Sequence, residues 1–151
     1  MTDILNTPAL KNTFSKLKAD AKPQFGKMSP QHIVEHLCSI IKISSGKKIS
    51  KFYFTQEEAD KLKAKLIYGD AELSPGIKNP ALGDEPPALV HSDLNAALEE
   101  LYIEITYFET HYKENPGITH THPRMGELKH EEWHVVHNKH FAHHFRQFQL
   151  L

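Results

Sequence analysis

The sequence predicts an all-α fold, a four-helix bundle in which one long connection carries a short extra helix. Apolar residues recur at intervals of three and four over four segments, and stretches rich in proline and glycine separate these segments. The 151 residues are 39% hydrophobic and 25% charged, ordinary values for one globular domain, and no internal repeat or linker divides them. We therefore expect a single domain over residues 1–151.

The first two helices have clear start signals. The first begins at Asn6, a polar cap with a proline in the first turn, and we expect it to end before Pro23. The second begins at Ser29-Pro30 and stops near Gly46. Its broad apolar stripe marks it as a core helix, and consists of Ile33, Val34, Leu37, Ile40 and Ile41.

The last two principal helices lie in the second half of the chain. The third is predicted from about Ser92 to Tyr112, with apolar residues alternating by four and three in the manner of packed helices. The fourth starts near Lys129 and is expected to continue to Leu151.

The connection from Lys47 to His91 has structure of its own. Thr55-Gln56-Glu57-Glu58 is a capping box that opens a short helix to about Leu66. Ser74-Pro75-Gly76 and Glu85-Pro86-Pro87 indicate turns and extended chain. A crossover of this kind lets neighbouring helices of a bundle run parallel.

His140 and His144 are four residues apart in the middle of the apolar face of the last helix, which also carries Trp133 and Val136. A buried polar ring without a partner costs about 1–3 kcal/mol, so both rings need one. An i, i+4 histidine pair suits a divalent metal ion, and an internal hydrogen-bond network is the alternative.

A third ligand for such a metal has to come from another helix. His36 lies at the edge of the apolar stripe of the second helix, whereas His32 and Glu35 point farther outward. Three imidazoles leave at least one coordination position open, which is typical of catalytic rather than structural zinc.

Two segments of the chain resemble the DinB-like superfamily. They are Met28-Ser29-Pro30-Gln31-His32-Ile33-Val34-Glu35-His36-Leu37 and the later His140-Phe141-Ala142-His143-His144-Phe145-Arg146-Gln147. The run from His122 to Leu128, followed by Trp133, looks like an uncharacterised branch of it. The resemblance implies a DinB-like four-helix bundle in which His36, His140 and His144 bind zinc or nickel. It also implies a metal-dependent enzyme that uses a low-molecular-weight thiol, although Phe145-Arg146-Gln147 lacks the glycine of the His-Arg-Gly-Gln segment common in relatives.

Four further residues are candidates for contacts to a ligand imidazole, to water or to substrate. His137 and Gln147 face inward, although simple packing explains them equally well, and His143 lies at the edge of the stripe. His122 precedes the last helix and can reach the site if its loop closes over the core, but we expect a solvated loop. His130 and His134 form another i, i+4 pair without a third inward partner, so we expect no second metal site there.

The composition excludes several functional classes. A formal net charge of -1 disfavours nonspecific binding to nucleic acid, and no apolar run is long enough to cross a membrane. The single cysteine, Cys38, forms no internal disulfide and is expected to be an inert buried thiol, which favours a cytoplasmic protein.

Two functions remain open from the sequence. One is a metalloprotein acting on a small-molecule substrate by nucleophilic transfer to an electrophile or by hydrolysis. The other is a noncatalytic binding or stress-associated helical module whose histidines satisfy one another. A homodimer formed through exposed apolar surface is compatible with both.

Overall fold

The computed structural model describes residues 1–75 and 85–151, and it is mostly helical, as predicted. Gly76, the last residue of one predicted turn, lies outside the described residues. The helices are α1 (Thr7–Ser15), α2 (Pro30–Ser44), α3 (Gln56–Leu66), α4 (Leu94–Glu114) and α5 (His130–Gln147). Two short strands, β1 (His120–His122) and β2 (Gly126–Leu128), pair antiparallel.

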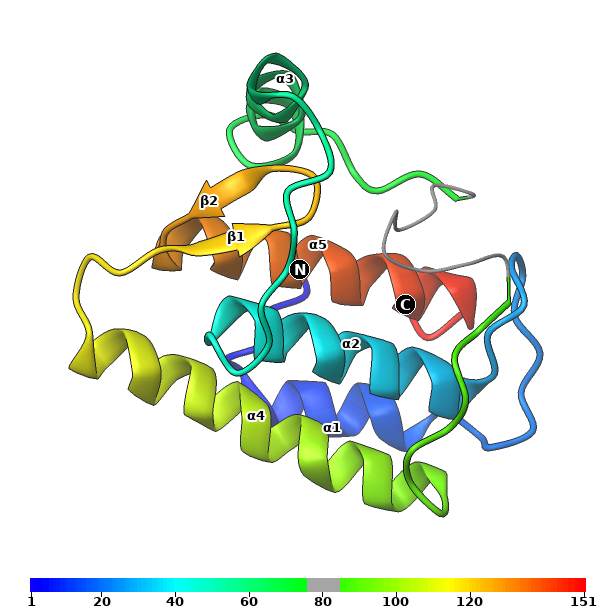
Figure 1. Cartoon of the computed structure of the whole chain (residues 1–151). Helices are drawn as coiled ribbons and strands as arrows, with labels where there is room; N and C mark the ends of the chain where they lie inside the picture. Colours follow the sequence, from blue (N-terminus) through cyan, green and yellow to red (C-terminus); the bar gives the residue numbers. More distant parts are fainter. Residues whose placement is uncertain (76–84) are drawn as a thin grey trace.

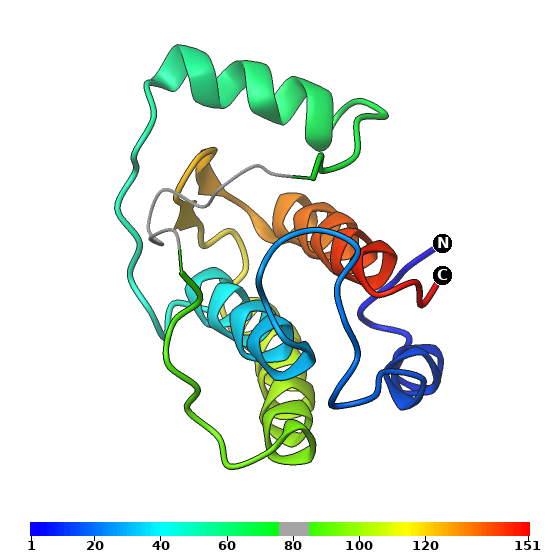
Figure 2. The same ribbon diagram turned by 90° about the vertical axis from the view of Figure 1, so that its right-hand side faces the viewer.

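Four helices, α1, α2, α4 and α5, lie alongside one another and enclose the core (Figure 1). The colours in Figure 1 show that α2 and α4 run in the same direction and that α5 returns in the opposite one. The parallel arrangement of α2 and α4 agrees with the expected effect of the long crossover. That crossover carries α3, which stands apart from the other helices in both views (Figure 2).

Aromatic side chains join α1 to α5 in the core. Phe14 of α1 makes edge-to-face contacts with Phe141 and Phe145, with ring centroids 6.3 and 5.1 Å apart. Trp133 has none of its surface exposed, which confirms that it is a core residue. Its indole N–H donates to the carbonyl of His120 and so fixes β1 against α5.

The predicted helix starts agree with the structure, and the predicted end of the last helix does not. The side chains of Asn6, Ser29 and Thr55 all cap their helices, and α2 ends two residues before Gly46, which has a φ of +80°. The prediction that the last helix reaches Leu151 is wrong, because α5 ends at Gln147 and Leu151 is 68% exposed. Gln149 has a φ of 55°, a left-handed conformation that an α-helix cannot contain.

The expectation of a solvated loop before the last helix is also wrong. Residues 120–128 form a β-hairpin that packs against α2 and contacts α5 through Trp133, and Met125 and Leu128 are 2% and 0% exposed. Burying these two side chains provides the driving force, because each large apolar side chain contributes about 1.5–3 kcal/mol on burial. The hairpin is therefore part of the core and lies where it can contribute to a site.

None of the helices in the described ranges is long and apolar enough to span a membrane.

Candidate metal centre

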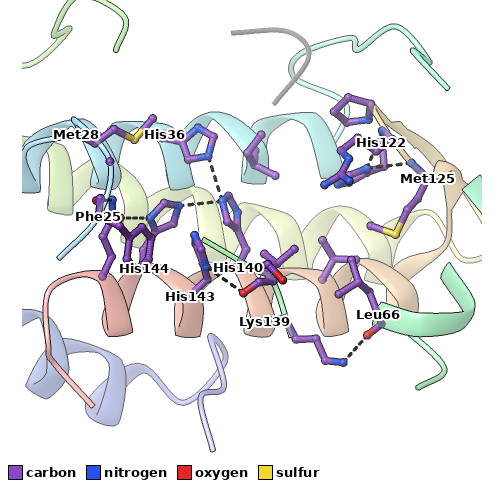
Figure 3. A pocket seen from close by; sticks show the side chains of 18 of the residues that line it. Phe25, Met28, His36, Leu66, His122, Met125, Lys139, His140, His143 and His144 are labelled. Carbon is purple, nitrogen blue, oxygen red and sulfur yellow. Dashed lines mark hydrogen bonds between the residues drawn. The ribbon is translucent and has the colours of Figure 1, made fainter. Parts of the chain in front are cut away.

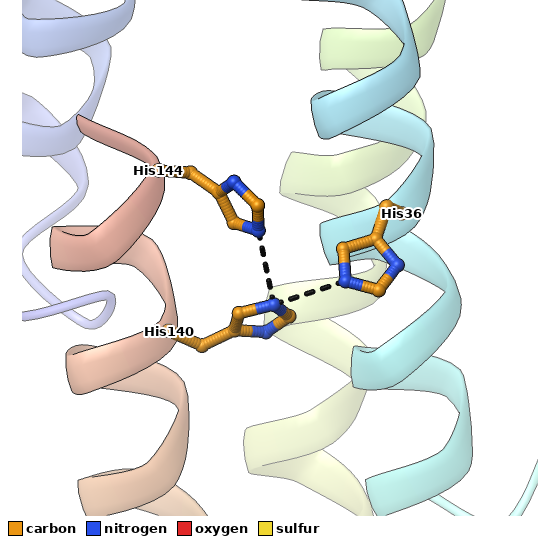
Figure 4. A group of neighbouring side chains, drawn as sticks. All are labelled: His36, His140 and His144. Atoms are coloured by element: carbon orange, nitrogen blue, oxygen red, sulfur yellow. Dashed lines mark hydrogen bonds between the residues drawn. The ribbon is translucent and has the colours of Figure 1, made fainter. Parts of the chain in front are cut away.

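Three histidine side chains from two helices converge between α2 and α5 (Figure 4). His140 Nε2 lies 3.0 Å from His36 Nε2 and 3.2 Å from His144 Nε2, and the three ligand atoms lie within 4.8 Å of one another. Two zinc–nitrogen bonds of about 2.0–2.1 Å at a tetrahedral angle hold their nitrogens about 3.3 Å apart. The spacing around His140 is thus close to that of adjacent ligands on one ion.

The side chain of Gln147 determines which nitrogen of His144 faces the cluster. Gln147 Nε2 donates to the carbonyl of Phe25, at 2.8 Å, so its Oε1 is free to accept. His144 Nδ1 lies 2.6 Å from that oxygen and therefore carries the proton. Neutral His144 then presents a lone pair on Nε2, the arrangement that a second partner commonly imposes on a metal-binding histidine.

Gly26 allows the Phe25 carbonyl to approach Gln147. It has a φ of +78°, which side chains rarely tolerate, and an added Cβ would lie 3.1 Å from Gln147 Nε2. The connection between α1 and α2 is thereby held against the end of α5, beside the histidine cluster.

Burial keeps the three imidazoles uncharged. It lowers the pKa of His36 to about 4, with a smaller contribution from His143, and it lowers the pKa of His144 to about 3. Burial, followed by repulsion from His36 and His144, puts the pKa of His140 well below its usual value. Neutral imidazole is the form that binds a metal ion, so the cluster is ready for one at neutral pH.

Hydrogen bonds among the three rings cannot satisfy all of them. A neutral His140 has at most one N–H at Nε2, and a single N–H cannot point along both the 3.0 and the 3.2 Å line. One of the two contacts therefore lacks a well-directed proton. A cation at the centre would meet all three lone pairs.

The cluster opens into a cavity of about 610 Å³. Figure 3 shows His144 toward the end that holds Phe25 and Met28, and His122 and Met125 at the opposite end, with His36 and His140 between them. Apolar side chains of α2, α3 and α5 contribute to the lining, and include Ile40, Leu62, Leu66 and Val136. A small organic molecule can therefore reach the histidines.

Comparison with known proteins gives the family of the chain. The family model described as "Protein of unknown function (DUF1569)" matches residues 4–150. The chain belongs to the DUF1569 family. No curated protein and no solved structure matches it significantly.

The DUF1569 chain places the other predicted site residues in different surroundings. Gln147 contacts a histidine of the cluster, as described above, and His143 is half-buried at the cavity wall, with Nδ1 3.3 Å from the carbonyl of Leu73. His122 also lines the cavity, at the hairpin end. His137 does not line it and contacts none of the three clustered histidines by hydrogen bond.

His137 is a core residue with one polar atom unpartnered. The hydroxyl of Ser44 donates to the Ile41 carbonyl, so its oxygen accepts from His137 Nε2–H at 2.8 Å. His137 Nδ1 is then a buried lone pair with no hydrogen-bond partner. Burial, followed by repulsion from His122 and His134, lowers the pKa of His137 to about 3.

The other histidine pair of α5 and Cys38 have partners outside the cluster. His130 contacts Glu109 and His134 contacts Asp3, and among the described residues the three-histidine cluster is the only group that could hold a metal. Cys38 is 3% exposed, and burial, with a hydrogen bond to Glu100, raises its thiol pKa to about 12. The thiol is thus protonated and unreactive at neutral pH.

Sequence reasoning missed two basic residues of the cavity, Arg124 and Lys139. Helical position puts Lys139 on the side of α5 opposite to His140, yet its ammonium donates to the carbonyls of Leu66, Gly69 and Ala71. Its long aliphatic chain allows this reach, which helical position alone does not indicate. Arg124 could have been found only by recognising the hairpin.

The buried ring of His137 predicts a loss of stability in acid. Since its pKa is lowered on folding, the unfolded chain binds more protons below pH 6.5, and stability falls as the pH falls toward 3. Between pH 7 and 5 this residue should remove about 2 kcal/mol. We expect His137→Phe, measured by urea unfolding at both pH values, to lose that part of the pH dependence; an unaltered dependence would contradict the assignment.

Proposed function

We propose that this DUF1569 protein binds one divalent metal ion, zinc or nickel, through His36, His140 and His144. We further propose that it is a DinB-like metalloenzyme in which a low-molecular-weight thiol or water attacks an electrophilic substrate. The observation that carries the proposal is the convergence of three neutral imidazole Nε2 atoms at the wall of an accessible cavity.

The ligand set supports an open site. Three neutral nitrogen donors suit zinc, nickel and other borderline divalent ions, and they leave a coordination position for a further group. A bound ion of this kind would lower the pKa of a thiol or of water held at that position. The resemblance of Met28–Leu37 and His140–Gln147 to the DinB-like superfamily supports the same three ligands.

The chain's own residues supply orientation and enclosure. Gln147 holds the His144 ring with Nε2 toward the cluster, and the carbonyl of Phe25 holds Gln147. His143, whose Nδ1–H donates to the Leu73 carbonyl, keeps its other nitrogen as an acceptor beside the cavity. We assign it the task of accepting a proton from the attacking group.

Metal content tests the proposed ligands directly. We expect wild-type protein purified without an affinity tag to contain about one metal ion per chain by elemental analysis, and His36→Ala and His140→Ala to contain far less. His134→Ala is the matched control, because His134 lies on α5 but contacts Asp3 outside the cavity. Equal, negligible metal in all four proteins would refute the site.

The orienting role of Gln147 can be measured separately. Gln147→Leu should lower metal affinity by about tenfold to a hundredfold, because the His144 ring loses its acceptor. Gln147→Glu keeps an acceptor for His144 Nδ1–H but loses the donor to Phe25, so it should retain more of the affinity than Gln147→Leu. Gln56→Leu at an exposed position of α3 is the control. Competition titration against a chelating dye gives the affinities, and equal affinity in the wild type and Gln147→Leu would contradict the role.

A noncatalytic helical module is the competing function, because the distances of 3.0 and 3.2 Å each lie within hydrogen-bonding range. The two functions differ in their response to chelation. An ion present at about a thousand times its dissociation constant stabilises the fold by about 4 kcal/mol. We therefore expect chelation to lower Tm by about 10 °C in calorimetry, whereas structural histidines predict no change.

A further inference from the structure

The hairpin end of the cavity presents two hydrogen-bond donors that the proposed metal site does not use. Arg124 lines the cavity, its buried Nε has no hydrogen-bond partner, and no carboxylate of the described residues forms an ion pair with it. The guanidinium carbon lies over the ring of Phe54, 5.3 Å from its centroid, a contact that leaves the N–H groups without an acceptor. A half-buried guanidinium without an acceptor is costly, because hydrogen bonds to charged groups are the strong ones.

His122 is fixed as a donor at the same end. Its Nδ1 accepts from the backbone N–H groups of Arg124 and Met125, at 3.0 and 3.2 Å. The ring is therefore protonated at Nε2 when neutral, and burial, followed by repulsion from Arg124, lowers its pKa to about 3. Among the described residues Nε2–H has no protein acceptor.

The charges around the cavity favour an anion. Lys27 and Glu85 form an ion pair with each other, at 2.7 Å. Lys139 is bound by carbonyl oxygens, which leave its positive charge in place, and the lining histidines described above are neutral. The lining residues of the described part of the chain thus carry two uncompensated positive charges, Arg124 and Lys139.

Apolar side chains separate the hairpin end from the histidine cluster. Ile40 is four residues beyond His36 along α2, and Val136 is four residues before His140 along α5, both in the direction of the hairpin. Four residues of helix rise about 6 Å. A ligand that touches both ends therefore needs an apolar segment about one helical turn long.

We propose that Arg124 and His122 form a carboxylate-binding subsite, so that the substrate is a small organic acid with its carboxylate at the hairpin and its reacting group at the histidine cluster. The second half of this statement rests on the proposed function, and the first half does not. Arg124 supplies a planar fork that matches a carboxylate, and His122 supplies a further N–H.

Binding calorimetry with matched probes tests the subsite. With zinc-loaded protein, 6-mercaptohexanoate should bind about tenfold to a hundredfold more tightly than 6-mercaptohexan-1-ol, the range expected for a hydrogen-bonded charge pair. Arg124→Gln should abolish the preference and keep the metal, and Arg124→Lys should keep part of it. Arg146→Gln is the matched control, because Arg146 is the chain's other arginine and pairs with Glu72 outside the cavity lining.

A metal-free arm separates the two proposals. In His36→Ala, hexanoate should still bind more tightly than hexan-1-ol, because neither probe uses the metal. If the wild type contains no metal and His36→Ala still prefers hexanoate, the proposed function is refuted and the subsite stands. Equal binding of acid and alcohol, no saturable binding of hexanoate, or an unchanged preference in folded Arg124→Gln would overturn the subsite.

Discussion

The burial of uncharged imidazoles between α2 and α5 is the constraint on which the site depends. A buried ring is tolerable only if its polar atoms find partners, and several inward-facing histidines of this chain have an identifiable one. Ser44 serves His137, Gln147 serves His144, and two backbone amides serve His122. The Nε2 atoms of His36, His140 and His144 instead face one another, and this convergence of three ring nitrogens distinguishes the cluster from His137 and His122, each of which has one ring nitrogen without a protein partner.

The helices and the connections between them have different tasks in the cavity. Helices α2 and α5 carry the three clustered histidines, whose spacing follows from helix geometry and from the packing of the core. The connections supply much of the rest of the wall, and each is held to a helix by a specific contact. Phe25 is held by Gln147, the segment after α3 by Lys139, and the hairpin by Trp133. Changes in the connections can therefore alter the ligand without altering the cluster.

Sequence periodicity was sufficient for the helices and for the choice of His36, His140 and His144, because helical spacing alone puts these rings on inward faces. It failed where partners come from distant segments. The hydrogen bond between His137 and Ser44 depends on how α2 packs against α5. The position of Arg124 at the cavity depends on a hairpin whose three-residue strands are too short to show an alternating pattern in the sequence. Leu151 was misplaced because the helical spacing was extended beyond Gln147, where the backbone turns left-handed.

The rigid span between the two ends of the cavity has a consequence for selectivity. Ile40 and Val136 lie on helices that also carry the clustered histidines, so the distance from the cluster to the hairpin cannot change without breaking core packing. Molecules too short to touch both ends lose one set of contacts, and longer ones meet Met125, which lines the hairpin end and is buried. Length and terminal charge together would then define the substrate, while the imidazoles define the chemistry.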